Sequence, residues 1–399
     1  MQKNPIRFLI ALIASITSFT YCSKTGNKTN SSTESYPAIQ AAFGTNINLN
    51  SLANYAKQTI PAYITKDNTG ANSITDSKAT LGRVLFYDKN LSIDNTISCS
   101  SCHQQKFAFG DTALASNGVS GGLTGRHAMR LINTRFSAET KFFWDERAAS
   151  LEQQTTKPIQ DHAEMGFSGL NGRPGISTLL SKLQGIGYYN ELFKFAYGDI
   201  TVTESRLQEC LAQFIRSIQS FDSKFDAGRA QAGSDLQNFV NFTNQENTGK
   251  TIFMSVPVFD ATGNRISGGF GCNGCHRAPE FDIDPLAGNN GIIGKLNAAG
   301  TDLTNTKAPT LRDLINTSGT ENTPMMHTGV IKTLQAAIGH YGNINANPQN
   351  TNLDPKLRPN GFGQQLNVTA AEVNAVIAFM KTLAGTNVYT DTRWSNPFK

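Results

Sequence analysis

Two short cysteine motifs carry the most specific chemistry in this chain. They share one pattern, two cysteines separated by two residues and followed directly by a histidine: Cys99, Cys102 and His103, and Cys272, Cys275 and His276. This pattern is typical of c-type haem attachment, in which both thiols bond to the haem vinyl groups and the histidine is the proximal ligand of the iron. A redox dithiol, a disulfide or half of a zinc site would explain the cysteine pairs but not the histidine after each pair. The sequence therefore predicts two covalently bound haems c.

What two such haems do depends on the sixth coordination position of each iron. An occupied position suits electron transfer, and an open one suits chemistry. Four further histidines could be ligands: His127, His162, His327 and His340. Taken singly, each is more often a hydrogen-bonding or structural residue than a ligand. These residues alone leave a non-enzymatic electron carrier open.

The bulk composition is that of an ordinary two-domain protein. A chain of 399 residues exceeds the usual size of a single core, and each half contains one haem motif. The hydrophobic content of 39% is sufficient for two cores. The formal net charge of +5 is not concentrated in a basic block, so no nucleic-acid partner is expected.

The N-terminus has the features of an export signal. Two basic residues precede an apolar run over 8–16, which is too short to cross a bilayer and suits the core of a signal peptide. Cys22 follows this run, as in bacterial lipoproteins, although Tyr21 is bulkier than the residue usual before the lipidated cysteine and leaves plain secretion as the alternative. We predict a signal peptide over 1–22, a flexible Ser-, Thr- and Asn-rich tether over 23–50, and lipid anchoring at Cys22 in the periplasm or cell envelope.

The elements expected to position the haem sites are mainly helices. Apolar residues at helical spacing predict one helix over 202–219 and another over 370–384. Each is opened by a threonine and a glutamate at capping-box spacing, Thr201 with Glu204 and Thr369 with Glu372. Cys210 falls on the apolar face of the first helix and is predicted to be a core residue. Glycine and asparagine accumulate in 286–301 and 342–364, which indicates long ordered loops.

The predicted fold class is therefore mainly α, with two cytochrome c-like helical domains that each bind one covalent haem and are held together by long loops. A polar stretch that begins at Asp226 suggests the boundary. We assign the N-terminal haem domain to 51–228 and the C-terminal haem domain to 229–391. No internal repeat is visible beyond the two haem motifs.

The residues that follow each motif come in an ordered series. After the first come Phe-Trp-Asp-Glu-Arg at 143–147, Leu-Glu-x-Gln at 151–154, Pro-Ile-Gln at 158–160 and Glu-Met at 164–165. After the second come Ala-Pro-Thr-Leu-Arg-Asp at 308–313, Pro-x-x-His-x-Gly at 324–329 and His-Tyr at 340–341. Over roughly 75–385 this order resembles the bacterial di-haem cytochrome c peroxidases, including their MauG-like branch.

The resemblance assigns roles to particular side chains. It implies that the haem on His103 is the peroxidatic one, with an open distal side. Glu164 matches the distal acid/base that moves a proton during cleavage of the O–O bond. Gln154 and Pro158 match residues that shape this distal pocket, and Trp144 matches a tryptophan that relays electrons between the haems.

Two departures from the family concern the first haem and a calcium ion. The loop over 116–125 contains no histidine that could cap the first iron, so we expect a five-coordinate iron that needs no reductive activation. His127 stands where the family has a calcium-binding asparagine. Calcium is therefore doubtful, although the backbone carbonyls of Lys307 and Pro309 could still bind it.

A third departure concerns the second haem. Tyr341 aligns with the axial methionine of the peroxidases and is the ligand type of the MauG-like branch. A tyrosinate stabilises higher oxidation states of iron, whereas a methionine raises the potential. The rival ligands are His340, Met325 and Met326. Thr328 replaces the usual aspartate after His327, which leaves the role of that histidine open.

These observations predict a dihaem peroxidase that reduces hydrogen peroxide to water. Its electrons would come from a small periplasmic redox protein, a cytochrome c or a cupredoxin, and pass from the C-terminal haem to the N-terminal haem. The alternatives are a MauG-like oxidase that uses peroxide to oxidise a partner protein or small molecule, and a non-enzymatic dihaem cytochrome. The membrane is expected to be touched only by the lipid anchor, and a homodimer is one option for assembly.

Overall fold

A computed structural model describes residues 34–399. Within this range, Tyr36–Lys399 form one compact unit. The predicted signal peptide, Cys22 and the first part of the predicted tether lie outside the described residues. No helix in the described range is long and apolar enough to cross a membrane.

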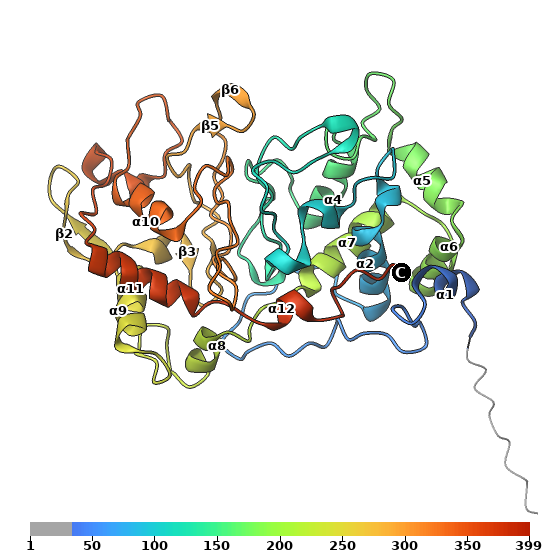
Figure 1. Cartoon of the computed structure of the whole chain (residues 1–399), viewed down its shortest axis with the longest axis horizontal. Helices are drawn as coiled ribbons and strands as arrows, with labels where there is room; N and C mark the ends of the chain where they lie inside the picture. The colour runs from blue at the N-terminus through green and yellow to red at the C-terminus, as the bar shows by residue number, and fades with distance from the viewer. Residues whose placement is uncertain (1–33) are drawn as a thin grey trace, which may run out of the picture. The chain divides into compact units, whose positions relative to one another are not determined.

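Helices dominate the described part of the chain (Figure 1). The α-helices are α1 (Pro37–Phe43), α2 (Asp76–Tyr87), α3 (Cys99–Cys102), α4 (Leu151–Gln160), α5 (Ile176–Gln184), α6 (Gly187–Tyr197), α7 (Glu204–Ser217), α8 (Lys224–Arg229), α9 (Asn244–Met254), α10 (Leu334–Gly342), α11 (Ala370–Lys381) and α12 (Asn387–Thr390). The 3-10 helices are η1 (Lys89–Leu91), η2 (Gln105–Phe107), η3 (Val119–Gly121), η4 (Thr134–Phe136), η5 (Cys272–Gly274), η6 (Pro355–Leu357) and η7 (Pro359–Gly361).

Strands within residues 34–399 are short and form three antiparallel pairs. The pairs are β1 (Pro257–Phe259) with β2 (Arg265–Gly268), β3 (His276–Arg277) with β4 (Asp282–Ile283), and β5 (Gly294–Lys295) with β6 (Ala298–Thr301). The Gly- and Asn-rich segments predicted as loops contain only the β5–β6 hairpin and the two turns η6 and η7 as regular elements. The mainly α fold class with long loops is confirmed.

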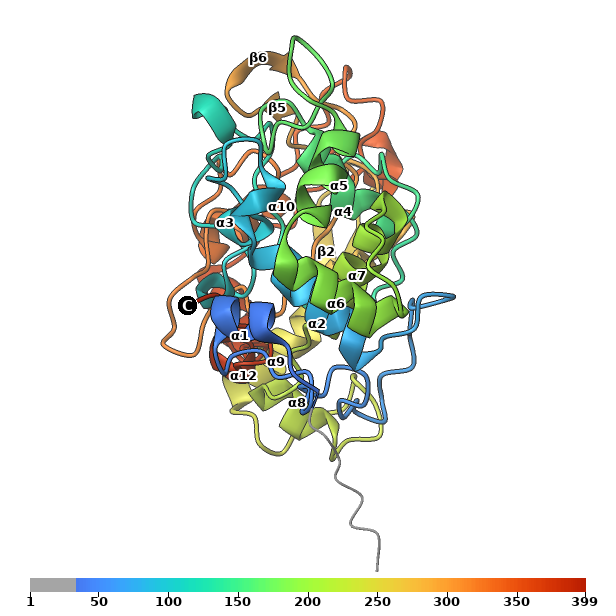
Figure 2. The same ribbon diagram turned by 90° about the vertical axis from the view of Figure 1, so that its right-hand side faces the viewer.

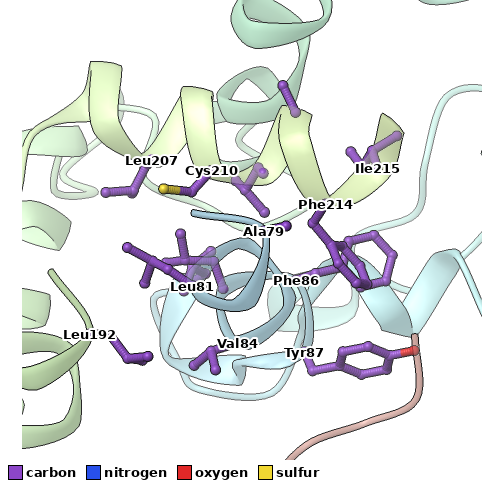
Figure 3. Packing of buried hydrophobic residues seen from close by; sticks show 14 of the residues in the cluster. Ala79, Leu81, Val84, Phe86, Tyr87, Leu192, Leu207, Cys210, Phe214 and Ile215 are labelled. Atoms are coloured by element: carbon purple, nitrogen blue, oxygen red, sulfur yellow. The ribbon is translucent and has the colours of Figure 1, made fainter. Parts of the chain in front are cut away.

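The core of the first half is built on α2 and α7, which lie side by side (Figures 1 and 2). At the crossing point, a Cβ on Gly82 would lie 1.9 Å from the carbonyl oxygen of Cys210, so only glycine allows the two backbones to approach this closely. Cys210 is fully buried among apolar side chains of both helices (Figure 3). Burial raises the pKa of its thiol to about 12, which confirms the prediction of an unreactive core residue.

The core of the second half repeats this arrangement with α9 and α11. A Cβ on Gly249 would lie 1.9 Å from the carbonyl oxygen of Ala375. In both halves a phenylalanine four residues further along the second helix, Phe214 or Phe379, packs on the same glycine. The two halves thus repeat an arrangement of backbones that the sequence does not reveal. The repeat lies in where the helix backbones touch, and few residue types are shared at these positions.

The structure differs from the tether predicted over 23–50. Residues 37–43 form α1, and Ile39 and Phe43 are buried in the core of the first half. The carboxylate of Glu191 in α6 accepts hydrogen bonds from two backbone N–H groups of the first turn of α1, at 3.1 and 2.9 Å. A few apolar side chains at helical spacing, together with this acidic cap, are enough to dock a segment of polar composition.

The two helices predicted from periodicity are present with shifted ends. The first is α7, and its N-cap is Thr203 rather than Thr201, because the Thr203 hydroxyl accepts from the N–H of Arg206 at 3.2 Å. The second is α11, with the predicted capping box of Thr369 and Glu372. Helix propensity and caps thus locate helix starts to within about two residues.

The chain passes from the first core to the second before the boundary that the sequence suggested at 228/229, which falls inside α8. Phe225 in α8 already belongs to the second core. After α11 the chain returns, and Val388 and Trp394 are buried in the first core. The division into domains over 51–228 and 229–391 stays a prediction.

Candidate active site

The first cysteine motif lines a cavity of about 440 Å³. One helical turn, α3, spans Cys99 and Cys102 and ends at His103, so the two thiols and the imidazole are presented together. His103 Nδ1 lies 3.2 Å from the carbonyl oxygen of Phe109. This contact orients the ring and leaves Nε2 available to a metal, the usual arrangement for a metal-binding histidine.

The second motif lines a cavity of about 660 Å³. Cys272 lies in η5, and His276 begins β3. Burial lowers the pKa of His276 to about 4, so its imidazole is neutral, the form that binds metals. Its Nδ1 is buried and has no hydrogen-bond partner among the described residues.

The residues at both cavities fit haem c. The four motif cysteines are free thiols, and no group of three or more His, Cys, Asp or Glu side chains that could hold another metal occurs within 34–399. Both cavities fall within the typical range of roughly 300–1,000 Å³ for ligand sites. Each therefore offers two thiols for covalent attachment, one neutral imidazole and a concave surface of suitable size.

The far side of the first cavity is formed by α4 and the turn after it. Gln154, Pro158 and Glu164 all line the cavity. The backbone at Gly118 packs directly against the turn that carries Glu164. A Cβ on Gly118 would lie 1.9 Å from the carbonyl oxygen of Ala163, so only glycine allows this contact. The structure thus brings together the three side chains that the sequence assigned to this pocket.

Glu164 has the electrostatics of a proton-transfer group. Burial, and to a smaller extent the neighbouring Asp161, raises the pKa of its carboxyl group to about 7, while Arg147 acts in the opposite direction. No hydrogen bond to its carboxylate oxygens occurs within the described part of the chain. A carboxyl group with a pKa near neutrality in a cavity can both accept and return a proton.

The far side of the second cavity is formed by α10. Tyr341, Met325 and Met326 line this cavity. The Tyr341 hydroxyl and the Met326 sulfur lie 3.5 and 3.1 Å from the amide nitrogen of Asn290. His340 instead directs Nε2 to the carbonyl oxygen of Asn290 at 2.8 Å. The geometry therefore favours Tyr341 and the two methionines over His340 as side chains that reach into the cavity.

Pro158 and Tyr341 occupy equivalent places in the two halves. Ser150 caps α4 and Thr333 caps α10, and each of the two residues stands eight positions after its cap. An isolated antiparallel β-bridge precedes each helix, formed by Phe142 with Ala148 before α4 and by Met325 with Ile331 before α10. Proline has no side-chain atom that can bind a metal, whereas tyrosine has a phenolic oxygen. At this point the first cavity therefore has no side chain that can bind a metal, and the second has a phenol.

The two cavities share one wall. It is formed by residues 127–130, Trp144 and residues 307–309, which line both cavities. The indole N–H of Trp144 donates to the carbonyl oxygen of His127 at 2.8 Å, and the Trp144 ring meets the ring of His327 edge to face at 6.2 Å. Trp144 is thus fixed between the two cavities.

The same wall contains the backbone carbonyls considered for calcium. Here the buried ammonium group of Lys307 lies 2.7 Å from Glu139 and 3.8 Å from Glu146 and also donates to the carbonyl oxygen of Lys141. His127 turns its Nδ1 to the carbonyl oxygen of Ala113 at 2.9 Å. A cation of the protein already uses the nearby carboxylates, and the doubt that the sequence raises about calcium stands.

Sequence reasoning missed two residues at these cavities. Asn290 lies in a Gly- and Asn-rich loop and carried no signal. Arg130 could have been found by aligning 128–133 with 308–313. Both segments have alanine in the first position and leucine in the fourth. In the third position Arg130 then stands opposite Thr310, so a charged residue faces an uncharged one. That alignment is supported by the backbone, because the sixth residues, Asn133 and Asp313, both adopt left-handed conformations.

Comparisons with known proteins agree with this geometry. The family described as di-haem cytochrome c peroxidase matches residues 76–233. The methylamine utilization protein MauG of Methylophilus methylotrophus is 28% identical over 330 residues, which cover 79% of this chain and 84% of that protein. The cytochrome c551 peroxidase of Nitrosomonas europaea is 27% identical, over 77% of this chain and 80% of that protein. A MauG-like protein associated with microbial copper homeostasis superposes with a TM-score of 0.65 at 24% identity, covering 86% of this chain and 99% of that structure.

The mainly α fold, with one cysteine motif on each of two cavities that share a wall, is that of a haem-dependent oxidoreductase. The chain is similar to the di-haem cytochrome c peroxidases and to MauG.

Proposed function

We propose that this protein reduces hydrogen peroxide to water at the first cavity, with electrons that enter at the second. The observation that carries the proposal is the difference between Pro158 and Tyr341 at equivalent positions, combined with Glu164 on the open side. Haem bound to His103 would supply an iron that binds peroxide and provides the two electrons needed to break its O–O bond. All further steps concern side chains of the protein.

The cysteines and histidines of the two motifs hold the cofactors. We assign the thioether bonds to Cys99 and Cys102 in the first cavity and to Cys272 and Cys275 in the second, and the proximal iron ligands to His103 and His276. Tyr341, which lines the second cavity, would provide a second protein ligand to the iron there. Burial raises the pKa of its phenol, so the hydroxyl stays protonated unless a metal ion takes the place of the proton.

Glu164 is the proton-transfer group. Its carboxylate accepts the proton of the peroxide oxygen nearer the iron and donates it to the departing oxygen, which then leaves as water. A pKa of about 7 suits both transfers. Gln154 offers an amide beside the same space, and Pro158 keeps the space free of a competing ligand.

Trp144 is the electron relay between the cavities. Its ring is fixed by the hydrogen bond to His127 and the contact with His327, and it borders both cavities. An aromatic ring at this place shortens the distance that an electron crosses in one step.

The remaining parts of the proposal concern cellular context. We propose export by the signal peptide, anchoring at Cys22, and a small cytochrome c or cupredoxin as the electron donor. The haem on His103 would belong to a domain over 51–228 and the haem on His276 to one over 229–391. A MauG-like oxidase is the second candidate, favoured by Tyr341 as the residue that fills the second cavity.

Two measurements test the proposal. Cyanide should convert only one of the two ferric haems to a low-spin complex, and peroxide should be consumed in stoichiometry with an oxidised cytochrome or copper-protein donor. If both ferric haems are low-spin and neither cyanide nor peroxide alters them, the protein is an electron carrier. Rapid reaction with peroxide without turnover of any donor would instead favour the oxidase.

A further inference from the structure

Arg130 lies in the wall between the two cavities and lines both of them. Within the described residues its guanidinium makes one hydrogen bond, in which Nη2 donates to the carbonyl oxygen of Thr310 at 3.0 Å. Its Nε is buried and has no hydrogen-bond partner there. The stem of the side chain packs on Gly110, where a Cβ would approach Arg130 Cγ to 2.9 Å, so the guanidinium cannot easily withdraw.

The other cationic side chains that line the two cavities all have a carboxylate partner. The pairs are Arg126 with Asp145, Arg147 with Asp145, Lys307 with Glu139, and Lys356 with Asp284. Arg312, which is fully buried, is held by both oxygens of Asp226 and by two backbone carbonyls. Within residues 34–399, no carboxylate oxygen lies within 4.0 Å of the Arg130 guanidinium.

An unpaired guanidinium in this position is costly. A buried donor without a partner has lost its hydrogen bonds to water and gained none in return, and the loss is larger when the group is charged. Burial lowers the pKa of Arg130 only to about 10, so the side chain still carries its charge at neutral pH. Asp313 and Tyr389 act on this charge from a distance, but no carboxylate of the described residues is close enough to bind it. The guanidinium therefore calls for an anion in direct contact.

Haem brings such an anion into each cavity, because every haem carries two propionate carboxylates. A guanidinium binds a carboxylate through two parallel charge-assisted hydrogen bonds, and Arg130 has unused donors for both. We infer that Arg130 binds a haem carboxylate at the shared wall and thereby raises the reduction potential of that haem. The inference rests on the proposed function only in requiring haem in the cavities.

The effect on potential follows from charge. A cation beside the haem favours the reduced iron, which carries one positive charge fewer than the oxidised iron. Without Arg130 the buried carboxylate would keep its negative charge only at a cost, so its pKa would rise and its protonation would be coupled to reduction.

The test is a spectroelectrochemical titration of the holoprotein in the absence of peroxide. We expect Arg130→Gln to lower the potential of one haem by at least a tenfold change in the one-electron equilibrium, about 59 mV. We also expect that potential to become pH-dependent near neutrality, and Arg130→Lys to restore most of both properties. Arg206→Gln, which removes an arginine paired with Asp199 on the surface, is the matched control and should change neither haem.

Unchanged potentials in Arg130→Gln would overturn the inference, and so would a fall in potential without a new pH dependence. If Arg130→Gln fails to retain haem, the test uses reduced-minus-oxidised infrared difference spectra instead. One spectrum is recorded for the wild type and one for Arg130→Lys. A shift of the haem carboxylate bands between the two proteins supports the pairing, and identical bands exclude it. Because no peroxide is used, these results are independent of whether the protein proves to be a peroxidase.

Discussion

In each half of the molecule, a helix before the cysteine motif crosses a helix that follows it, and a glycine allows the contact. Gly82 meets the carbonyl group of Cys210 in the first half, and Gly249 meets that of Ala375 in the second, with the same 1.9 Å approach for an added Cβ. The end of the second helix is also held in the same way in both halves. The backbone N–H of Asn133 donates to the carbonyl oxygen of Ile218 after α7, and that of Asp313 donates to the carbonyl oxygen of Leu383 after α11.

The two halves differ at the side chains placed on this common backbone. Pro158 and Glu164 line the first cavity, and Tyr341 lines the second. In the proposed function, Pro158 leaves the first haem iron without a second protein ligand, Tyr341 provides one for the second, and Glu164 is a proton-transfer group at the first cavity alone. The proposal thus gives a duplicated scaffold two roles by exchange of a few residues.

The largest effect is expected when the first half is made to resemble the second. Pro158→Tyr should give the first iron a phenolate ligand, convert that haem to a six-coordinate form and abolish peroxide turnover. Electron paramagnetic resonance of the ferric protein and steady-state peroxide consumption measure the two parts. Pro158→Ala, which adds no ligand, is the matched control. Full activity in a six-coordinate Pro158→Tyr protein would contradict the assignment of the first cavity.

Glu164→Gln should lower kcat by about 10²–10⁴-fold, since a glutamine cannot accept the proton of peroxide. Haem content and the ferric spectrum should be unchanged. Asp161→Asn, which alters the neighbouring charge and leaves the Glu164 carboxyl group in place, should have a much smaller effect. Wild-type turnover in Glu164→Gln would exclude this residue as the base.

The pH profile sharpens the same point. The pKa of Glu164 is raised from 4.5 to about 7, so the ionised base is lost below pH 7 and kcat should fall about tenfold for each pH unit. Between these two values the folded protein binds more protons at Glu164 than the unfolded chain does. Its contribution to the free energy of unfolding therefore decreases as the pH rises through this window. Glu164→Gln should remove the pH dependence of kcat and that of the free energy of unfolding. If either pH profile is the same in Glu164→Gln as in the wild type, Glu164 is not its source.

The shared scaffold predicts matched losses of stability. Gly82→Ala and Gly249→Ala each place a Cβ 1.9 Å from a backbone carbonyl oxygen, and each should cost about 3 kcal/mol or more in the free energy of unfolding. Gly339→Ala in α10, where no atom lies within 4 Å of the added Cβ, should be neutral or stabilising by up to about 1 kcal/mol. Chemical denaturation gives all three values. A tolerated Gly82 variant beside a damaging Gly249 variant would break the equivalence of the halves.

The smallest effect is expected at the wall. Trp144→Phe removes the hydrogen bond to His127, which should cost about 1 kcal/mol in the free energy of unfolding. The phenyl ring still occupies much of the volume of the indole, but it should be a weaker relay for electrons between the haems. Stopped-flow spectra should show slower electron transfer between the haems with an unchanged rate of peroxide binding. An unchanged transfer rate would show that electrons take another route.

Much of this protein was predictable because its chemistry is local in sequence. Covalent haem attachment needs two thiols and an imidazole within five residues, so both motifs indicated their cofactors directly. Capping boxes and apolar periodicity likewise located α7 and α11, since both are set by neighbouring residues.

The tertiary structure alone decided how these parts meet. The shared wall joins residues 127–130 to 307–309, which are too far apart in sequence for any local pattern to relate them. The docking of α1, the equivalence of Pro158 and Tyr341, and the unpaired charge of Arg130 also depend on which backbones come into contact. The two cysteine motifs indicate which cofactors the chain can hold, and only the tertiary structure places Pro158 at one cavity and Tyr341 at the other.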